Sequence, residues 1–432
     1  MATINRRRKT APVTHEGAPA ARLTPEQELR RSVLACLLWE DTFYEEGEAI
    51  ADRIARLVAA VPLETAAEIA IEARERQHIR HAPLLIVREM ARRGGRIVGD
   101  TLARVIQRPD ELTEFLAIYW REGRRPLSKQ VKRGLALAFP KFDAYQLAKY
   151  DRPKAVRLRD VLFLCHAKPR DEEQAAVWRQ LVEGTLPPAD TWEVALSRGD
   201  DPYETWTRLL VERKLGGLAL LRNLRNMLAA GVDLDLIRQA IEEHQFERVL
   251  PFRFIAAARY APKLEPVLEA AMFRALQGVP RLPGKTVLVI DHSGSMNVPL
   301  SSRSELRRFD AATGLAILLR EICEELDMIA FSSDAALVPP RHGFALADAI
   351  EKATGWGGTL TEKAKRLADS LGYDRIIIVT DEQSHQALSA PQGKGYVINV
   401  APYQNGVGYG PWVHIDGWSE AVVRWIAEYE RL

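Results

Sequence analysis

The sequence of 432 residues predicts a multi-domain protein, with stacked α-helices in residues 23–280 and a doubly wound α/β domain in residues 281–432. Helical periodicity fills the first part, whereas short β-branched runs alternate with helical stretches in the second. Residues 1–22 are polar, and we expect them to form a flexible basic tail. The apolar share of 47% and the charged share of 27% are ordinary for a globular protein.

The first part has apolar residues at spacings of three and four, with Gly, Pro or Asp between the stretches. So many short helices with short connections are typical of a solenoid built from helix pairs. Because no strict sequence period is present, we expect degenerate repeats of the HEAT kind. The clearest helical stretches are 24–44, 63–77, 82–94, 99–120, 128–139, 159–167, 171–184, 202–214, 218–231 and 264–276.

The second part begins near Pro280, where the composition changes. The runs KTVLVID, LDMIAFSS, DRIIIVTD and GYVINVA have the character of buried parallel strands. Helical stretches are expected at 309–326, 345–355 and 361–372, and a further helix at the C-terminus. Strands that alternate with helices predict a doubly wound, Rossmann-like sheet.

The segment around Gly284 suggests a nucleotide-binding loop at first sight. A Walker A loop requires G-x-x-x-x-G-K-[ST] and then a helix, because backbone amides wrap a phosphate at the helix N-terminus. Here Gly278 is one residue too far from the Gly284–Thr286 segment, and a strand follows. The spacing therefore argues against a nucleotide site.

A cation site is the better interpretation of the residues that follow. Asp291, Ser293 and Ser295 come after the first predicted strand, at the sheet edge where open α/β sheets bind ligands. Thr359, in a Gly-Gly-Thr loop, and Asp381, after a later strand, should reach the same edge. Carboxylate and hydroxyl oxygens suit Mg²⁺. The alternative is that the hydroxyls only cap the following helix and no metal binds.

The cysteines and the apolar runs indicate where in the cell the protein is expected. Cys36, Cys165 and Cys323 lie far apart, so neither a metal knuckle nor a disulfide framework is expected. No apolar run has the length of a membrane span, and the N-terminal stretch lacks the apolar core of a secretory signal. We therefore expect a cytoplasmic protein that has no membrane partner.

Positive charge is concentrated in one part of the helical region. The net charge is only +2, but residues 120–159 contain 12 Lys and Arg against 3 Asp and Glu. Such a cluster attracts a polyanion, and nearby aromatic residues can stack on unpaired bases. On a helix, Lys129, Lys132 and Arg133 would share one face. Arg121, Arg124 and Arg125 precede this stripe. Tyr119 and Trp120 more simply pack in the core.

The order Asp291, Ser293, Ser295, Thr359 and Asp381 resembles the metal-ion-dependent adhesion site of von Willebrand factor A domains. The resemblance implies that these residues hold Mg²⁺, with Asp381 bound directly or through water. It also implies that one coordination position stays available for an acidic group of a partner.

The stretches HIRHAPLLIVREMAR, YWREGRRPLSKQVKRGLALAFPKFDAYQLAKYDR and RLRDVLFLCHAKP resemble the TROVE module, the HEAT-repeat ring of the Ro autoantigen and its bacterial relatives. Members of that family also end in a von Willebrand A domain. The resemblance implies a ring that binds Y RNAs on its outer rim and the single-stranded 3′ ends of misfolded RNAs in its central hole. It suggests an exonuclease partner such as polynucleotide phosphorylase, tethered by RNA.

The same resemblance implies particular RNA contacts. Lys149 matches a family lysine, and His166 matches a family histidine required for RNA binding. A family arginine falls on Pro153, where Arg152 or Lys154 takes its place. Lys168 follows His166 in the same basic segment.

Three functions remain open from sequence. The leading hypothesis is a monomeric, non-enzymatic RNA-binding protein that serves RNA stabilisation or quality control. The second is a scaffold that binds proteins through Mg²⁺ without RNA. The third is an enzyme, either a metal-dependent hydrolase or a chelatase subunit, although the missing Walker A loop argues against a chelatase.

Overall fold

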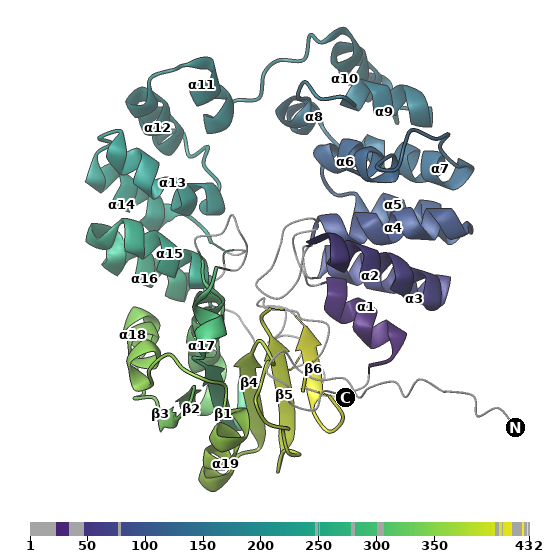
Figure 1. Ribbon diagram of the computed structural model, residues 1–432. Coiled ribbons are helices and arrows are strands. Elements are labelled where there is room, and N and C mark those ends of the chain that lie inside the picture. The colour runs from purple at the N-terminus through teal and green to yellow at the C-terminus, as the bar shows by residue number, and fades with distance from the viewer. Residues whose placement is uncertain are drawn as a thin grey trace, which may run out of the picture.

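The computed structural model describes residues 23–33, 47–76, 79–246, 249, 251–277, 281–299, 306–401, 406–407, 409–416, 426 and 430. Figure 1 shows two arms of helices that face each other, with an α/β domain joining them at one end, so that the chain forms a ring. The expected fold class, helical repeats followed by a von Willebrand A-type domain, is confirmed. No helix among these residues is both long and apolar enough to span a membrane.

The first arm runs from α1 to α10. Its helices are α1 (Pro25–Val33), α2 (Gly47–Ala60), α3 (Leu63–Glu75), α4 (His81–Arg93), α5 (Ile97–Val105), α6 (Pro109–Tyr119), α7 (Lys129–Ala138), α8 (Ala144–Tyr150), α9 (Leu158–Cys165) and α10 (Glu172–Glu183). A 3₁₀ turn, η1 (Phe139–Lys141), follows α7. The stretch 99–120, which we treated as one helical run, is divided because Pro109 starts α6 and cannot continue α5.

The second arm contains the remaining helices of the first part. They are α11 (Trp192–Arg198), α12 (Pro202–Val211), α13 (Gly217–Ala229), α14 (Leu234–Glu243), α15 (Pro251–Tyr260) and α16 (Glu265–Ala275), with the 3₁₀ turn η2 (Pro262–Leu264) before α16. Local capping fixes several helix starts in both arms. Ser128, Asp143, Asp171, Thr191, Asp201 and Asp233 each accept a hydrogen bond from a backbone N–H of the first turn.

The α/β domain has a six-stranded sheet in the order β3-β2-β1-β4-β5-β6. Its strands are β1 (Leu282–Asp291), β2 (Cys323–Phe331), β3 (Ala335–Leu337), β4 (Arg375–Thr380), β5 (Lys394–Asn399) and β6 (Val413–Asp416). Every neighbouring pair is parallel except β2 and β3. The four strands predicted from sequence are confirmed, whereas the short β3 and β6 were missed.

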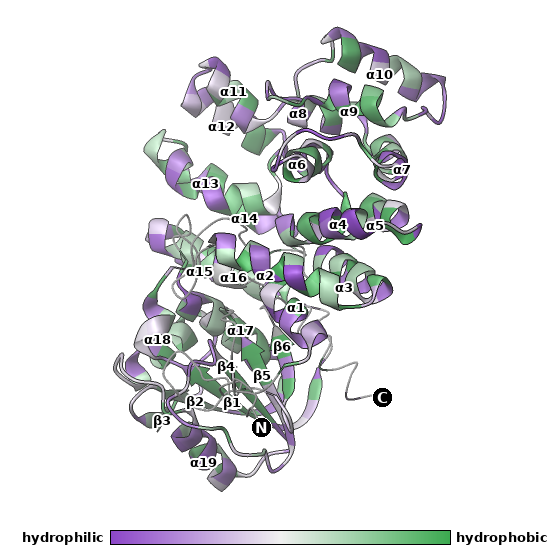
Figure 2. Cartoon of the chain, turned by 45° about the vertical axis from the view of Figure 1, so that its right-hand side comes forward, coloured by the Kyte–Doolittle hydropathy of each residue, from purple (hydrophilic) through white to green (hydrophobic). Residues whose placement is uncertain are grey.

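Helices cover both faces of this sheet. They are α17 (Arg308–Ile322), α18 (Gly343–Ala353) and α19 (Thr361–Leu371), with the 3₁₀ turn η3 (Gly294–Asn297) after β1. Leu288 and Ile290 of β1 join the cluster that contains α17, while Val287 and Val289 join the cluster that contains α19. The alternation along a strand thus places buried residues on two faces, and Figure 2 shows the central strands hydrophobic along their length.

One expected helix was too long. The stretch 309–326 was predicted to be helical, but α17 ends at Ile322 and β2 starts at Cys323. The prediction for 323–326 is therefore wrong, because Glu325 and Leu326 pair with Lys285 and Thr286 of β1. The expected C-terminal helix lies almost entirely outside the described residues.

Buried apolar residues divide the molecule differently from the sequence boundary near Pro280. One cluster unites the helices from α1 to α10, and a separate cluster runs from α12 through α16 into the sheet. The second arm and the α/β domain therefore share a hydrophobic core. The first arm has a core of its own.

The α/β domain meets each arm through a different ion pair. On the second arm, Arg259 of α15 pairs with Asp310 of α17, with Nη–Oδ distances of 2.6 and 2.9 Å. On the first arm, Arg31 of α1 pairs with Glu382, which follows β4. The Arg31 pair is the more deeply buried, because its side chains are 1% and 0% exposed, against 43% for Arg259.

Candidate cation site and basic surface

The two predicted carboxylate ligands, Asp291 and Asp381, come together because β1 and β4 are adjacent parallel strands. Ile290 is in register with Val379, so Asp291 and Asp381 leave the sheet at the same edge. Both carboxylates are 0% exposed. The backbone N–H of Ser293 donates to Asp291 Oδ1 at 2.8 Å, and the hydroxyls of Ser293 and Ser295 lie 3.2 Å apart. The expected turn after β1 is therefore present.

Glycines bring the Thr359 loop to this edge. Ser293 and Gly357 form a parallel bridge, and the N–H of Gly294 donates to Gly357 O at 2.9 Å. A Cβ at position 357 would lie 2.6 Å from Ser333 Oγ, so any larger residue there would have to displace the Ser333 side chain. Thr359, two residues later, is 4% exposed. The structure thus gathers the loops of all five predicted ligands at one end of the sheet.

The electrostatics of the edge suit a cation. Burial, and next the nearby Asp381 carboxylate, raise the pKa of Asp291 to about 7. A divalent cation between the two carboxylates would remove that repulsion. The described residues contain no group of three or more His, Cys, Asp and Glu with metal-binding geometry, so a cation at this edge would need serine and threonine oxygens as further ligands. The residues present fit Mg²⁺, a hard cation that prefers oxygen.

Two further residues take part in the site and were not found from sequence. Thr380 donates its hydroxyl to Asp291 Oδ2 at 2.5 Å, and Arg308 Nη1 lies 3.2 Å from Asp381 Oδ2. Thr380 directly precedes Asp381, so its position next to the site follows from the strand register. Arg308 carried no local signal, because it belongs to the first turn of α17.

His292 lies between two predicted ligands, but its side chain is directed away from them. Its ring stacks on that of Phe309, with ring centres 4.7 Å apart, and the Trp356 ring packs edge-on, with its centre 3.9 Å from that of His292. Its Nδ1 contacts Thr354 Oγ1 at 3.0 Å. Burial lowers the pKa of His292. The side chain therefore packs among aromatic rings, as alternation along the chain after Asp291 requires.

The predicted basic stripe of α7 is present. Val131, Leu135 and Ala138 are buried, and the three cations occupy the opposite side of the helix. Lys129 is exposed and Lys132 half-buried. In the described part of the chain, neither lysine has a carboxylate within ion-pair distance. Arg133 differs, because it pairs with Asp100 of α5 at 2.8 Å.

The arginines before this stripe are engaged within the protein. Arg121 pairs with Glu48 at 2.8 Å, and Arg125 lies 3.4 Å from Glu122. The guanidinium of Arg124 lies 5.0 Å from the centre of the Trp120 ring. The indole of Trp120 donates to Arg125 O at 2.7 Å. These side chains order the loop between α6 and α7, and their charges are partly compensated.

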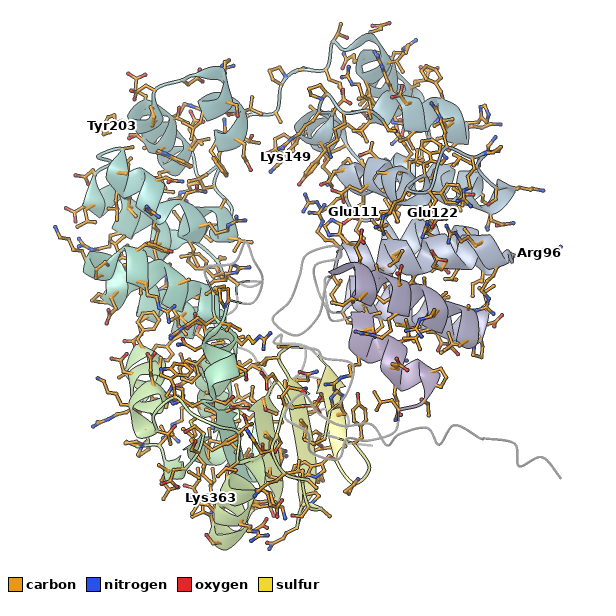
Figure 3. The ribbon with its side chains drawn as sticks, viewed as in Figure 1. Arg96, Glu111, Glu122, Lys149, Tyr203 and Lys363 are labelled. Atoms are coloured by element: carbon orange, nitrogen blue, oxygen red, sulfur yellow. The ribbon has the colours of Figure 1, made fainter. Side chains whose placement is uncertain are left out.

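The remaining predicted RNA contacts lie around α8 and α9. Lys149 is half-buried, with its Nζ 5.9 Å from the ring centre of Tyr150. Figure 3 shows Lys149 on the side of α8 that faces across the ring, whereas Arg96 lies at the outer margin. Arg152, Lys154, His166 and Lys168 are exposed. His166 ends α9 in the left-handed conformation, with φ 54°.

An exposed aromatic residue near His166 was missed from sequence. Phe163 is 59% exposed, and Arg159, one turn earlier on the same face of α9, is also exposed. In contrast, Tyr119 is 7% exposed, in line with the core position expected for it. Phe163 was overlooked because it belongs to the apolar run VLFLC, which is typical of the buried stripe of a short helix.

These features define the class of protein: a ring of helical repeats joined to an A-type α/β domain with an oxygen-lined site. Residues 184–277 match the family model of the TROVE domain. The fold is similar to that of the Ro (RSR) protein of Deinococcus radiodurans, with a TM-score of 0.62 and 19% identity over 94% of this chain and 99% of that chain. No curated protein sequence matches. Both findings agree with the predicted resemblance: residues 184–277 match the TROVE domain, and the fold is that of a bacterial Ro protein.

Proposed function

We propose that this chain is the RNA-binding protein of a small ribonucleoprotein. It binds a Y-like non-coding RNA on the basic outer face of the first arm, and it accepts single-stranded 3′ ends of misfolded or structured RNAs in the ring. Its role is RNA stabilisation or quality control. The TROVE match and the Ro-type fold support this proposal.

The observation that carries the proposal is the pattern of ion pairing in the first arm. Most arginines of α3 to α6 are held by carboxylates, including Arg74, Arg80, Arg88 and Arg104. Among the described residues, no carboxylate pairs with Lys129, Lys132, Arg152 or Lys168. Cations without internal partners can neutralise phosphates and release counterions.

The position of Lys149 suggests a division of labour. Because Lys149 faces across the ring, it is suited to the single-stranded tail of an RNA. The α7 lysines, on the exposed side of their helix, are suited to the phosphates of a structured RNA. An exoribonuclease such as polynucleotide phosphorylase would then reach the bound RNA without a large protein interface.

We further propose that Mg²⁺ is held by Asp291, Ser293, Ser295, Thr359 and Asp381. The ion would supply a positive charge and one exchangeable coordination position for an acidic group of a partner. The protein residues hold and orient the ligand oxygens, with Thr380 fixing Asp291. We assign the site to binding and propose that the chain, located in the cytoplasm, is not an enzyme.

The test is to sequence the RNA that co-purifies with the chain from its native cell and to measure its affinity across a range of salt concentrations. Small structured RNAs with free 3′ ends, and a steep fall in affinity with salt, are expected. A flat salt response would reject electrostatic RNA binding. Protein partners that need Mg²⁺ but no RNA would favour the scaffold function instead.

A further inference from the structure

The cation site and the closure of the ring share one short segment, residues 380–382. Thr380 donates to the metal-site carboxylate Asp291, and Asp381 is a predicted ligand. The next residue, Glu382, turns in the opposite direction and pairs with Arg31 of α1. Three consecutive side chains therefore serve the cation site and the contact with the first arm.

Several neighbouring side chains fix the position of the Glu382 carboxylate. His414 of β6 contacts the second carboxylate oxygen at 3.0 Å, and Tyr409 stacks on His414 with ring centres 4.1 Å apart. Gly406 packs so closely that a Cβ there would overlap both Glu382 and Arg31.

The backbone of this segment is constrained as well. Glu382 has φ 61°, a left-handed conformation that is rare for a residue with a side chain. Its N–H donates to Thr380 Oγ1 at 3.0 Å, and the same hydroxyl donates to Asp291. A continuous path of bonds thus links Asp291, Thr380 and Glu382 to Arg31. Strained conformations of this kind persist only where the surroundings hold them.

The ion pair between Arg31 and Glu382 can have a large effect on the closure of the ring. Among the described residues, the buried apolar side chains of the first arm form a cluster separate from that of the second arm and the sheet. The chain between α10 and α11 is the covalent link between the two bodies. A polar contact near the other end of the first arm can therefore decide whether α1 stays docked.

We propose that Arg31 is a positioning residue of the cation site, so that binding of a divalent cation and docking of α1 on the α/β domain stabilise each other. This inference rests on the proposed cation site and not on RNA binding. Coupling of this kind is reciprocal: a change at either site must alter the affinity at the other by the same factor. The first arm thereby senses whether the cation is bound.

The test measures Mg²⁺ affinity by calorimetry on the full chain after removal of divalent ions. Arg31→Met should lower the affinity about 5- to 20-fold, within the usual range of coupling between sites. Arg259→Met is the matched control, because it removes an interdomain arginine from the other seam. It should change the affinity less than about twofold, the scale of a surface ion pair.

Hydrogen exchange of the wild-type chain gives a second readout that does not depend on a variant folding. Amides of residues 25–33 should exchange more slowly in Mg²⁺ than in EDTA, and Asp291→Ala should abolish the difference. Equal exchange in both conditions, or equal affinity losses in Arg31→Met and Arg259→Met, would overturn the coupling. Absence of Mg²⁺ binding in the wild type would overturn the cation site and the coupling together, while the salt dependence of RNA binding would still stand by itself.

Discussion

The cation site and the basic surface of the first arm use charge in opposite ways. At the cation site, buried carboxylates converge from two adjacent strands, and burial, followed by their mutual repulsion, raises the pKa of Asp291 to about 7. On α7 to α9, the cations include exposed side chains such as Lys129 and Arg152, which lie on different elements. A buried site of this kind selects one small ion by geometry. A dispersed surface instead binds a polyanion of variable shape, with little demand on any one side chain.

The largest effect is expected from Asp291→Ala. Loss of one outer-shell partner of a metal commonly costs 10- to 100-fold in affinity, so loss of a direct ligand should cost at least about 100-fold. RNA affinity should stay within about twofold of the wild type. Titration calorimetry with Mg²⁺ and filter binding with RNA measure the two effects. Asp348→Ala, which removes an exposed carboxylate from the same domain, is the control. Equal Mg²⁺ affinity in both variants would refute the assigned site.

The double variant Lys129→Ala/Lys132→Ala should weaken RNA binding about tenfold and lower the slope of log affinity against log salt by roughly 1.4 to 1.8. Adding Arg133→Ala should change little more, because Arg133 is already paired with Asp100. Binding measured at several salt concentrations gives the slopes. Lys363→Ala/Arg366→Ala removes two exposed cations of the α/β domain, 53% and 78% exposed, and should leave the slope unchanged. The same fall in both double variants would show that only net charge matters.

Phe163→Ala should reduce the affinity for single-stranded RNA by about 1 kcal/mol, the lower range for one stacked base. The salt slope should not change, because no charge is removed. Phe163→Trp should preserve binding, since a larger ring can also stack. Leu137→Ala on α7 is a suitable control, because Leu137 is also exposed, at 48%, but has no ring. Loss of affinity in Leu137→Ala of similar size would argue for general apolar contact.

The smallest effect concerns the seam on the second arm. Burial opposes ionisation of Asp310, but the hydrogen bond and charge of Arg259 prevail and lower its pKa. The ionised pair therefore stabilises the fold above the usual aspartate pKa, and this contribution is lost as the pH falls toward the lowered value. Asp310→Asn should be destabilised at pH 7 by about 1 kcal/mol or less, because Arg259 is partly exposed. Thermal unfolding should show the difference shrinking on acidification; a constant difference would exclude the ion pair as its cause.

The sequence predicted those parts of the fold and site that depend on local patterns. The strand around Val289 and the helix with Lys129 were found because burial imposes a period on a few adjacent residues. The ligand loops were found because parallel strands end at a common edge. Cys323 was misassigned because a charged strand entrance, with Glu324 and Glu325, resembles the end of an amphipathic helix.

Features that depend on distant segments could not be predicted in the same way. Arg31 and Glu382 are 351 residues apart, and each looks like an ordinary surface charge in its local sequence. Arg308 near Asp381 and the pairing of Arg121 with Glu48 are similar cases. In each case the partner is set by the tertiary fold, for which a single sequence contains no local signal.

The separation of 351 positions between Arg31 and Glu382 also sets an order of events during synthesis. At typical rates of about 5 to 20 residues per second, the ribosome needs roughly 20 to 70 seconds to make the chain that separates them. Throughout that interval α1 cannot form its contact with Glu382, because Glu382 has not yet been made. Docking of α1 is therefore among the last steps of maturation, and newly made chains pass through an unclosed stage in which helper proteins or nucleic acids can still reach the interior.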